Sequence, residues 1–205
     1  MREILKLTNV RHSYSECANL IENFTLTMNA GEIVALAGKN GCGKTTLLKI
    51  TGGLLEPRGG KVTVCNKKPN DVRPSISFIF QDPTKQIIGT TVFEDILFGL
   101  RNLKVEKTVA ENKTKEILCH LKIEHLANTP TFKLSGGEAQ MVAIAGVLAT
   151  DPKLLLADEP TSMLDEVHVN LFIKAIQKRA QSGLCVLTST HDEKLLSIAS
   201  HIVNI

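Results

Sequence analysis

The sequence predicts an α/β fold built on a parallel sheet, and three observations lead to this expectation. Several short runs are apolar without interruption, which is typical of strands buried on both faces of a sheet. In the last third of the chain such runs alternate with segments of helical spacing, as in βαβ units. One run is followed at once by a glycine-rich turn. The length of 205 residues suits one large domain or a core that carries an inserted lobe.

Composition argues against several other classes of protein. Lys and Arg total 24 against 21 Asp and Glu, a net charge of +3, with no basic block, so we expect no nucleic-acid partner. The five cysteines are widely spaced, which favours neither a disulfide framework nor a zinc ribbon and fits a reducing cytosol. The longest apolar passage, residues 141–149, is far below the roughly 18 to 20 residues that span a bilayer.

The first third of the chain reads as short strands between turn residues. We expect a small sheet there that leads into the larger one. The expected strands cover residues 4–7, 24–28, 33–37 and 61–65.

The middle of the chain, about 91–149, changes to helical spacing and predicts a helical lobe inserted between core strands. Three capping-box patterns support this, because each would begin a helix. They are Thr91-x-x-Glu94, Thr108-x-x-Glu111 and Ser135-x-x-Glu138. Buried strands are expected at 76–80, 154–157 and 185–189, and helices at 166–181 and 192–199.

The strongest chemical signal is the segment Gly38-Lys39-Asn40-Gly41-Cys42-Gly43-Lys44-Thr45, which lies between a buried strand and a helical stretch. It satisfies the phosphate-loop pattern in its required context. Glycines let backbone N–H groups surround phosphate oxygens, and the helix N-terminus adds positive potential. Lys44 would reach the β and γ phosphates, and the Thr45 hydroxyl would bind Mg²⁺. A glycine-rich turn that happens to hold a lysine is the disfavoured alternative.

Two acids, Asp158 and Glu159, follow the buried run 154–157. Carboxylates at the end of a buried strand are costly unless they meet a cation or hydrogen-bond donors. Asp158 would orient Mg²⁺, and Glu159 would polarise a water that attacks the γ-phosphate. Taken alone, the pair would more often be a capped turn.

The segment Leu134-Ser135-Gly136-Gly137-Glu138-Ala139-Gln140 predicts a second anion-binding helix N-terminus. One nucleotide does not need two such sites within one chain. Taken alone, the segment would more often be an ordinary capping box.

The order of these motifs resembles the nucleotide-binding ATPase subunit of an ABC transporter. The phosphate loop, LSGGEAQ, LLLADE, SMLD and then His191 cover nearly the whole chain, and LSGG is highly specific to that family. The resemblance implies an α/β P-loop NTPase (RecA-like) core with a small antiparallel β subdomain and an inserted α-helical subdomain. A single domain over 1–205 is expected, with 1–81 and 150–205 as the core and 82–149 as the helical subdomain.

The resemblance also implies that two subunits pair head to tail, with each ATP held between the phosphate loop of one and the LSGG helix of the other. Residues expected to bind the nucleotide within one chain are Tyr14, which would stack on adenine, and Gly38, Lys39, Asn40, Gly41, Cys42, Gly43, Lys44, Thr45 and Thr46. Residues expected to act on the partner's nucleotide are Ser135, Gly136, Gly137, Glu138 and Asp165.

For hydrolysis, the resemblance implies that Glu159 acts as general base, that His191 contacts the γ-phosphate, and that Lys44 assists. Gln81 would touch Mg²⁺ and the attacking water and link the core to the helical lobe. The expected Mg²⁺ ligands are Thr45, Gln81 and Asp158. The ordinary alternatives are a surface glutamine at 81, a packed strand-end histidine at 191 and a packed tyrosine at 14.

Residues 82–100 resemble the ATPases of energy-coupling-factor importers, which take up vitamins and transition-metal ions. In that group this stretch helps to form a groove for helices of the membrane subunit. Phe93, Ile96, Leu97 and Leu100 form one helical stripe that would pack inward, against those helices, or both. The expected partners are a second ATPase subunit and integral membrane subunits, which would hold this chain peripherally at the cytoplasmic face of the membrane.

Departures from the family pattern leave alternatives open. Cys42 replaces a small residue, so a thiol there would make the ATPase sensitive to alkylation. Glu138 replaces a commoner glutamine and adds negative charge, which would slow turnover or mark one of two unlike sites. Because the sequence ends at Ile205, we expect dimerisation to depend on ATP and membrane partners. Other functions to weigh are a soluble ABC ATPase acting on nucleic acid or ribosomes, and a non-hydrolysing regulatory subunit.

Overall fold

The main sheet of the computed structural model, which describes residues 2–14 and 20–205, has five strands in the order β5-β6-β7-β3-β8. Every neighbouring pair is parallel. The strands are β3 (Ile33–Ala37), β5 (Ile76–Ile79), β6 (Leu154–Asp158), β7 (Cys185–Ser189) and β8 (His201–Asn204). The expected α/β fold is confirmed, and β8 is a strand that the sequence pattern did not indicate.

The small sheet is antiparallel, in the order β2-β1-β4. Its strands are β1 (Glu3–His12), β2 (Ile21–Asn29) and β4 (Gly59–Val64). The first two are longer than predicted, because register shifts along their pairing interrupt the simple alternation of inward and outward side chains.

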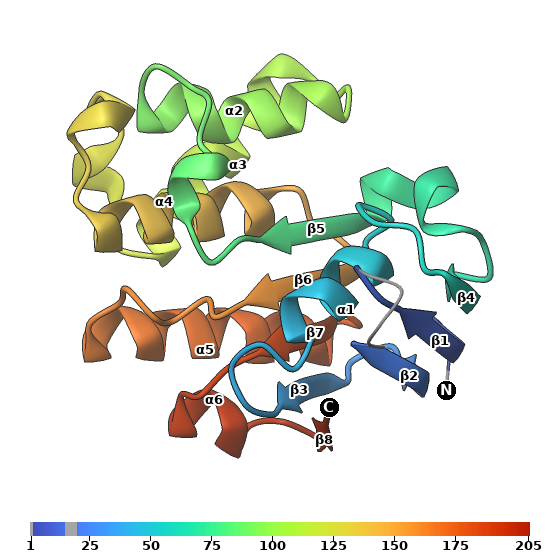
Figure 1. The fold of residues 1–205 in the computed structure, drawn as a ribbon. Helices are drawn as coiled ribbons and strands as arrows, with labels where there is room; N and C mark the ends of the chain where they lie inside the picture. Colours follow the sequence, from blue (N-terminus) through green and yellow to red (C-terminus); the bar gives the residue numbers. More distant parts are fainter. Residues whose placement is uncertain (1, 15–19) are drawn as a thin grey trace.

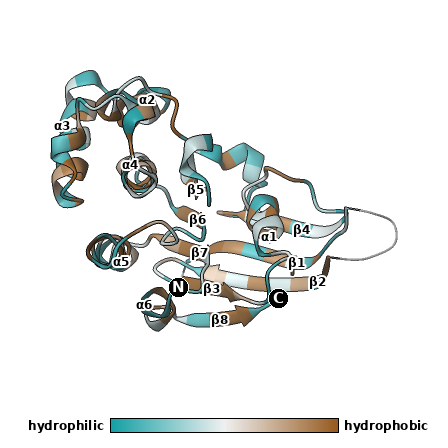
Figure 2. Ribbon diagram, turned by 60° about the vertical axis from the view of Figure 1, so that its left-hand side comes forward, coloured by the Kyte–Doolittle hydropathy of each residue, from teal (hydrophilic) through white to brown (hydrophobic). Residues whose placement is uncertain are grey.

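Alternate side chains of the main sheet pack into two separate apolar cores. In β6, Leu154 and Leu156 face the core shared with helix α1 (Lys44–Thr51) and the small sheet. Leu155 and Ala157 face the core shared with helix α5 (Glu166–Gln181) and the helical lobe. Figure 2 shows this layering, with α1 and the small sheet on one side and α5 on the other.

Three helices gather beyond β5 to form the predicted helical region (Figure 1). They are α2 (Val92–Asn102), α3 (Lys107–His120) and α4 (Gly136–Ala149). Thr91 and Ser135 cap α2 and α4 as expected. The expected box at Thr108 is wrong, because Glu106 is the N-cap of α3 and its carboxylate accepts the hydrogen bond from the Val109 N–H.

The remaining helical elements are short, apart from α5, whose bounds match the prediction. The C-terminal helix α6 (Glu193–Ser197) begins after Asp192, which caps it. Single turns of 3₁₀ helix lie at Pro83–Lys85, Glu124–Leu126 and Thr131–Lys133, and a longer 3₁₀ stretch at Pro69–Ser75 is interrupted at Val72. Among the residues described, no helix is both long enough and apolar enough to cross a membrane.

The apolar stripe of α2 packs inward. Ile96, Leu97 and Leu100 are at most 1% exposed, and Phe93 is partly buried against the same core. Of the alternatives weighed for this stripe, the structure therefore shows inward packing. These residues hold the lobe together and do not form a free docking surface. The large apolar side chains that the helical region exposes are Ile88, Phe98, Val109 and Phe132.

Candidate functional site

The phosphate loop connects β3 to α1 and depends on three glycines with positive φ. Gly38, Gly41 and Gly43 have φ of 151°, 81° and 110°, a region that disfavours side chains. A Cβ at Gly38 would lie 2.7 Å from the Cys42 Sγ and 2.9 Å from the Ile205 carbonyl oxygen. The loop can therefore fold back on itself only with glycine at 38.

Lys44 begins α1 and folds back across the loop that precedes it. Its Nζ donates to the carbonyl oxygens of Gly38 at 2.8 Å and Lys39 at 3.2 Å. The residue is only 8% exposed, and none of the described carboxylates forms an ion pair with it. A buried ammonium held on two neutral carbonyls leaves positive charge available for an anion in the loop.

Asp158 joins the end of β6 to the phosphate loop and to β7. Its carboxylate accepts hydrogen bonds from the Thr45 Oγ1 at 2.7 Å and the Ser189 Oγ at 2.6 Å. Asp158 is 4% exposed, so these two donors compensate a buried charge. Two of the three expected Mg²⁺ ligands are thus brought into contact. Ser189 was not predicted. The sequence shows only that it ends a buried strand, and its position beside Asp158 follows from the pairing of β6 with β7.

Glu159 lies one residue beyond β6 in a strained backbone conformation, with φ of 46°. Its N–H donates to both the carbonyl oxygen and the Oγ of Ser189, each at 3.1 Å. A positive φ in a non-glycine residue costs on the order of 1 kcal/mol and is common at functional sites. Ser189 therefore bonds to both acids, through its hydroxyl to the Asp158 carboxylate and through its two oxygens to the Glu159 N–H.

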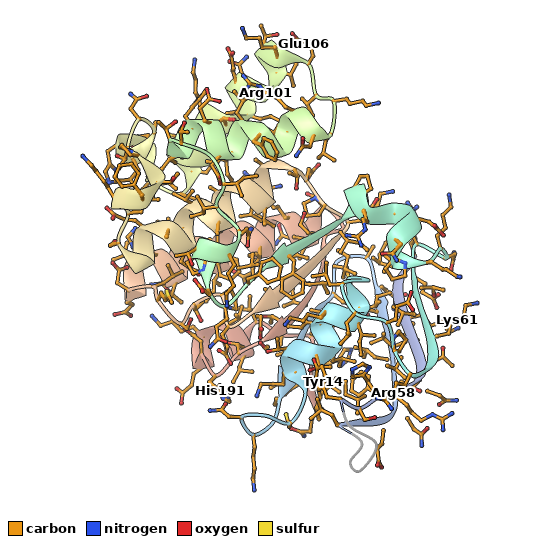
Figure 3. All side chains as sticks on the ribbon, turned by 45° about the horizontal axis from the view of Figure 1, so that its top comes forward. Tyr14, Arg58, Lys61, Arg101, Glu106 and His191 are labelled. Atoms are coloured by element: carbon orange, nitrogen blue, oxygen red, sulfur yellow. The ribbon has the colours of Figure 1, made fainter. Side chains whose placement is uncertain are left out.

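His191 and Glu159 face one another across the end of the sheet. The His191 Nε2 lies 3.5 Å from the Glu159 Oε1, and the side chains are 61% and 19% exposed respectively. The histidine is therefore not the packed strand-end residue of the alternative interpretation. Figure 3 places it at an exposed edge of the molecule, far from Arg101 and Glu106 of the helical region.

Tyr14 lies beside the first turn of α1 and is largely exposed. The Tyr14 hydroxyl and the Thr46 Oγ1 are 3.1 Å apart, while the residue is 66% exposed. The buried ring of His12 meets it edge-on at 5.1 Å between centroids. An exposed aromatic ring next to a phosphate loop suits the expected stacking on a base. Figure 3 shows Tyr14 close to α1.

Gln81 follows β5 and is exposed. It forms no hydrogen bond with another residue that the structure describes. The structure therefore brings two of the expected Mg²⁺ ligands, Thr45 and Asp158, into contact, and Gln81 forms no hydrogen bond with either of them.

The LSGG segment forms the N-terminus of α4 and contains a complete capping box. The Ser135 N–H and Oγ donate to the Glu138 Oε2 at 2.8 and 2.7 Å, and the Glu138 N–H donates to the Ser135 Oγ at 3.4 Å. The hydroxyl and N–H of Ser135 lower the pKa of the Glu138 carboxyl. The segment thus forms the ordinary capping box that was weighed as the alternative. The Glu138 carboxylate is hydrogen-bonded to Ser135, the serine that is expected to contact a nucleotide.

A close approach ties this segment to the SMLD segment. A Cβ at Gly137 would lie 2.9 Å from the Met163 carbonyl oxygen, so glycine lets α4 pack there. Asp165 caps α5, accepting from the His168 N–H at 2.9 Å, and that backbone bond lowers its pKa. Both segments are largely exposed, and no hydrogen bond within the described chain connects them to the phosphate loop.

A groove of about 260 Å³ lies on the surface where α2, α4 and β5 meet. Ile88 and Phe98 line it and are 66% and 45% exposed. Gly146 lines it from α4, and a Cβ there would meet nothing within 4 Å. The groove therefore presents apolar side chains beside open space.

Comparison with known sequences gives a consistent result. A family model described as ABC transporter matches residues 21–162. The energy-coupling factor transporter ATP-binding protein EcfA1 of Leuconostoc mesenteroides is 37% identical over 99% of this chain and 77% of its own length. The protein EcfA2 of Methanospirillum hungatei is 36% identical over 95% of this chain, which spans about half (51%) of that relative.

Solved structures agree in fold. The cbiO1 protein from Clostridium perfringens, described as part of the ABC transporter complex cbiONQ, superposes with a TM-score of 0.85 at 31% identity, over 100% of this chain and 85% of its own. A dimeric bacterial ABC transporter cassette gives 0.89 at 30% identity, over 98% and 94%. The same cassette in a post-hydrolysis state bound to ADP and phosphate gives 0.88 at 30% identity, again over 98% and 94%.

Proposed function

Because this chain belongs to the ABC transporter family, we propose that it is the ATP-binding and ATP-hydrolysing subunit of an importer of the energy-coupling factor type. The predicted family and P-loop fold are confirmed by matches that cover most of the chain. The observation that carries the proposal is the convergence of Lys44, Thr45 and Asp158 at one end of the main sheet.

ATP would bind along the phosphate loop, with Tyr14 against the base and Lys44 against the terminal phosphates. Thr45 and Asp158 offer hard oxygen ligands in direct contact with one another, which is the donor type that Mg²⁺ prefers. The ion would neutralise charge on the phosphates. We propose Gln81 as a further ligand that approaches only when nucleotide is present.

Hydrolysis would depend on the acid at the edge of this site. The Glu159 carboxylate would take a proton from the attacking water as the water oxygen bonds to the γ-phosphorus, while the bond to the β–γ bridging oxygen breaks and ADP leaves with its electron pair. His191, 3.5 Å from that carboxylate, would orient it and donate to the phosphate. Ser189 would hold the Glu159 backbone in place through its carbonyl and hydroxyl oxygens.

A second ATPase subunit would complete the site. The N-terminus of α4 is exposed and carries N–H groups that suit an anion, yet it has no hydrogen-bonded link to the phosphate loop of its own chain. Ser135, Gly136 and Gly137 would therefore act on the nucleotide of the partner, with Glu138 and Asp165 beside the interface. This arrangement accounts for two anion-binding segments in a chain with one phosphate loop.

Membrane subunits would dock in the groove between α2 and α4. Its exposed apolar residues, Ile88 and Phe98, suit an inserted amphipathic helix. We assign the chain to the cytoplasmic face of the membrane, held there by its partners, and assign the imported substrate to the micronutrients, a vitamin or a transition-metal ion. Residues 1–81 and 150–205 would form the nucleotide-binding core, and 82–149 the lobe that moves with the membrane subunits.

The test is affinity purification of the tagged chain from its native membranes, with mass spectrometry of the co-purifying proteins. We expect a multi-spanning membrane protein with wild type and with Val109→Phe, which adds bulk on the exposed face of α3. Gly146→Leu, which fills the groove from α4, should lose that partner while the purified chain keeps its ATPase activity. Recovery of ribosomes or DNA in place of a membrane protein would overturn the importer assignment. Retention of the membrane partner by Gly146→Leu would overturn the assignment of the groove as its docking site.

A further inference from the structure

A pocket of about 650 Å³ lies at the amino-terminal ends of the strands of the main sheet, opposite the end that carries the phosphate loop. Lys153 and Leu184, which line it, directly precede β6 and β7, whereas the proposed nucleotide-binding residues follow the carboxyl ends of β3 and β6. Its size falls within the range of about 300–1,000 Å³ that is usual for small-molecule sites. No residue of this pocket takes part in the proposed ATPase chemistry.

The pocket has an apolar wall. Ile117 from the end of α3 and Leu184 before β7 are each 5% exposed. Leu171 and Ala175 of α5 are half-buried on the same side. These surfaces suit the hydrocarbon part of a ligand.

The polar lining is strongly unbalanced in charge. Four cationic side chains line the pocket, and Asp151 is its single carboxylate. The cations are Lys153, Lys174, Lys178 and Arg179. Leu171, Lys174, Ala175 and Lys178 follow the i, i+3, i+4, i+7 spacing of one helix face, so α5 presents charge and apolar surface together.

Arg179 is the least exposed cation of the pocket, and its position is fixed by an ion pair and by backbone hydrogen bonds. The Arg179 Nη1 lies 3.1 Å from the Asp151 Oδ1, and the arginine side chain is 28% exposed while the aspartate is 75% exposed. The Arg179 carbonyl oxygen accepts from the N–H groups of Ser182 and Leu184, each at 3.0 Å. These bonds fix the turn between α5 and β7, so this wall is formed before any ligand arrives.

We propose that this pocket binds a soluble amphipathic organic anion. The apolar part of the ligand packs against Ile117, Leu171 and Leu184, and its carboxylate or phosphate lies among Lys174, Lys178 and Arg179. A charge-assisted contact with a partly desolvated guanidinium is stronger than one with a fully hydrated lysine. This binding is separate from the proposed ATPase function and stands or falls independently of it.

The test uses octyl phosphate below its micellar concentration as the probe, titrated into the ¹⁵N-labelled full chain. Saturating Mg²⁺-ADP is present to keep the probe out of the phosphate loop. Saturable shifts are expected for the amides of Ala175 and Leu184. Octyl glucoside, which has the same chain and no charge, should bind at least tenfold more weakly.

Paired variants measure the charge requirement. Lys174→Gln with Lys178→Gln should weaken octyl phosphate at least tenfold. Lys67→Gln with Lys68→Gln removes the same charge from exposed positions outside the pocket and should leave affinity unchanged. Equal binding of octyl glucoside, or equal affinity of the two double variants, would overturn the proposal. Binding only to vesicles that contain phosphatidic acid, with none to monomeric octyl phosphate, would also overturn it and indicate a membrane surface.

Discussion

The phosphate-loop end of the main sheet and the N-terminus of α4 are both proposed to bind anions, yet they are built differently. At the phosphate loop, Thr45, Asp158 and Ser189 come from three segments and their side chains meet in a buried network. At α4, the bonds between Ser135 and Glu138 span three residues and lie at the surface. Tertiary structure therefore completes the first element, while the second is built from local bonds and is exposed, as our proposal of a nucleotide held by a partner subunit requires.

The largest effect is expected from removing the proposed base while keeping the buried network. Glu159→Gln should lower ATP turnover by roughly 10²- to 10³-fold, because the amide cannot take a proton from water. Binding of ATP should persist, and the protein should accumulate as a closed dimer in size-exclusion chromatography with Mg²⁺-ATP. Turnover close to wild type would show that Glu159 is not the base.

Mixing two inactive variants tests whether the exposed element serves another copy. Lys44→Ala and Ser135→Arg should each reduce ATPase activity more than tenfold alone. A 1:1 mixture should recover up to about a quarter of wild-type activity, because half of the dimers are mixed and each contains one intact site. A mixture as inactive as its components would contradict a site shared between two copies of this chain.

The Cys42 thiol provides a chemical test of the phosphate-loop end of the main sheet. Cys42 is partly exposed, and iodoacetamide should inhibit ATPase activity several-fold in wild type by placing bulk in the loop. Cys42→Ala should be resistant, and bound ATP should slow the reaction. Burial raises the pKa of the Cys185 thiol, so peptide mapping should find that residue unmodified.

A smaller effect is expected from the charge beside Ser135. Glu138→Gln keeps an acceptor for the capping bonds and removes a negative charge that would face the phosphates of the partner's nucleotide. Turnover should rise about two- to fivefold, as expected for relief of a partly screened repulsion. Glu106→Gln is the matched control, since Glu106 is also an acidic cap with a lowered pKa but belongs to α3. Equal changes in both variants would contradict a specific role for Glu138.

The smallest effect is expected on the pH dependence of folding stability. The pKa of Glu138 is lowered from 4.5 by its bonds with Ser135, so its contribution to folding is present above the unfolded pKa and is lost as pH falls through the lower folded value. The melting temperatures of wild type and Glu138→Gln should therefore differ most at neutral pH and converge below pH 4.5. A difference that grows on acidification would contradict this sign.

The sequence predicted elements whose signals are local. The phosphate loop and α5 are examples, because a cap, a glycine pattern and apolar spacing lie within a few residues of one another. Thr108 shows the limit of such signals, since α3 begins two residues earlier than this pattern predicted, with Glu106 as its N-cap.

The motifs predicted that Thr45 and Asp158 share one Mg²⁺ ion, but direct contacts between distant segments could not be read from residue spacing. The Thr45–Asp158 bond joins residues 113 positions apart, and Ser189 reaches Asp158 across 31. Neither sequence separation indicates which strands are neighbours. The order β6-β7-β3 places their ends together, so the role of Ser189 becomes visible only when the sheet is assembled. Similarly, the strand β8 follows from pairing with β3 and not from its own short pattern.

The position of Tyr14 gives the protein a native optical probe. The chain has one tyrosine and no tryptophan, so nearly all of its intrinsic near-ultraviolet emission originates beside the first turn of α1. Because that ring is 66% exposed and its hydroxyl contacts Thr46, a base that stacks on it would alter its emission without any label. Nucleotide exchange in a mixed complex could then be followed from this subunit whenever its partners are spectrally separable.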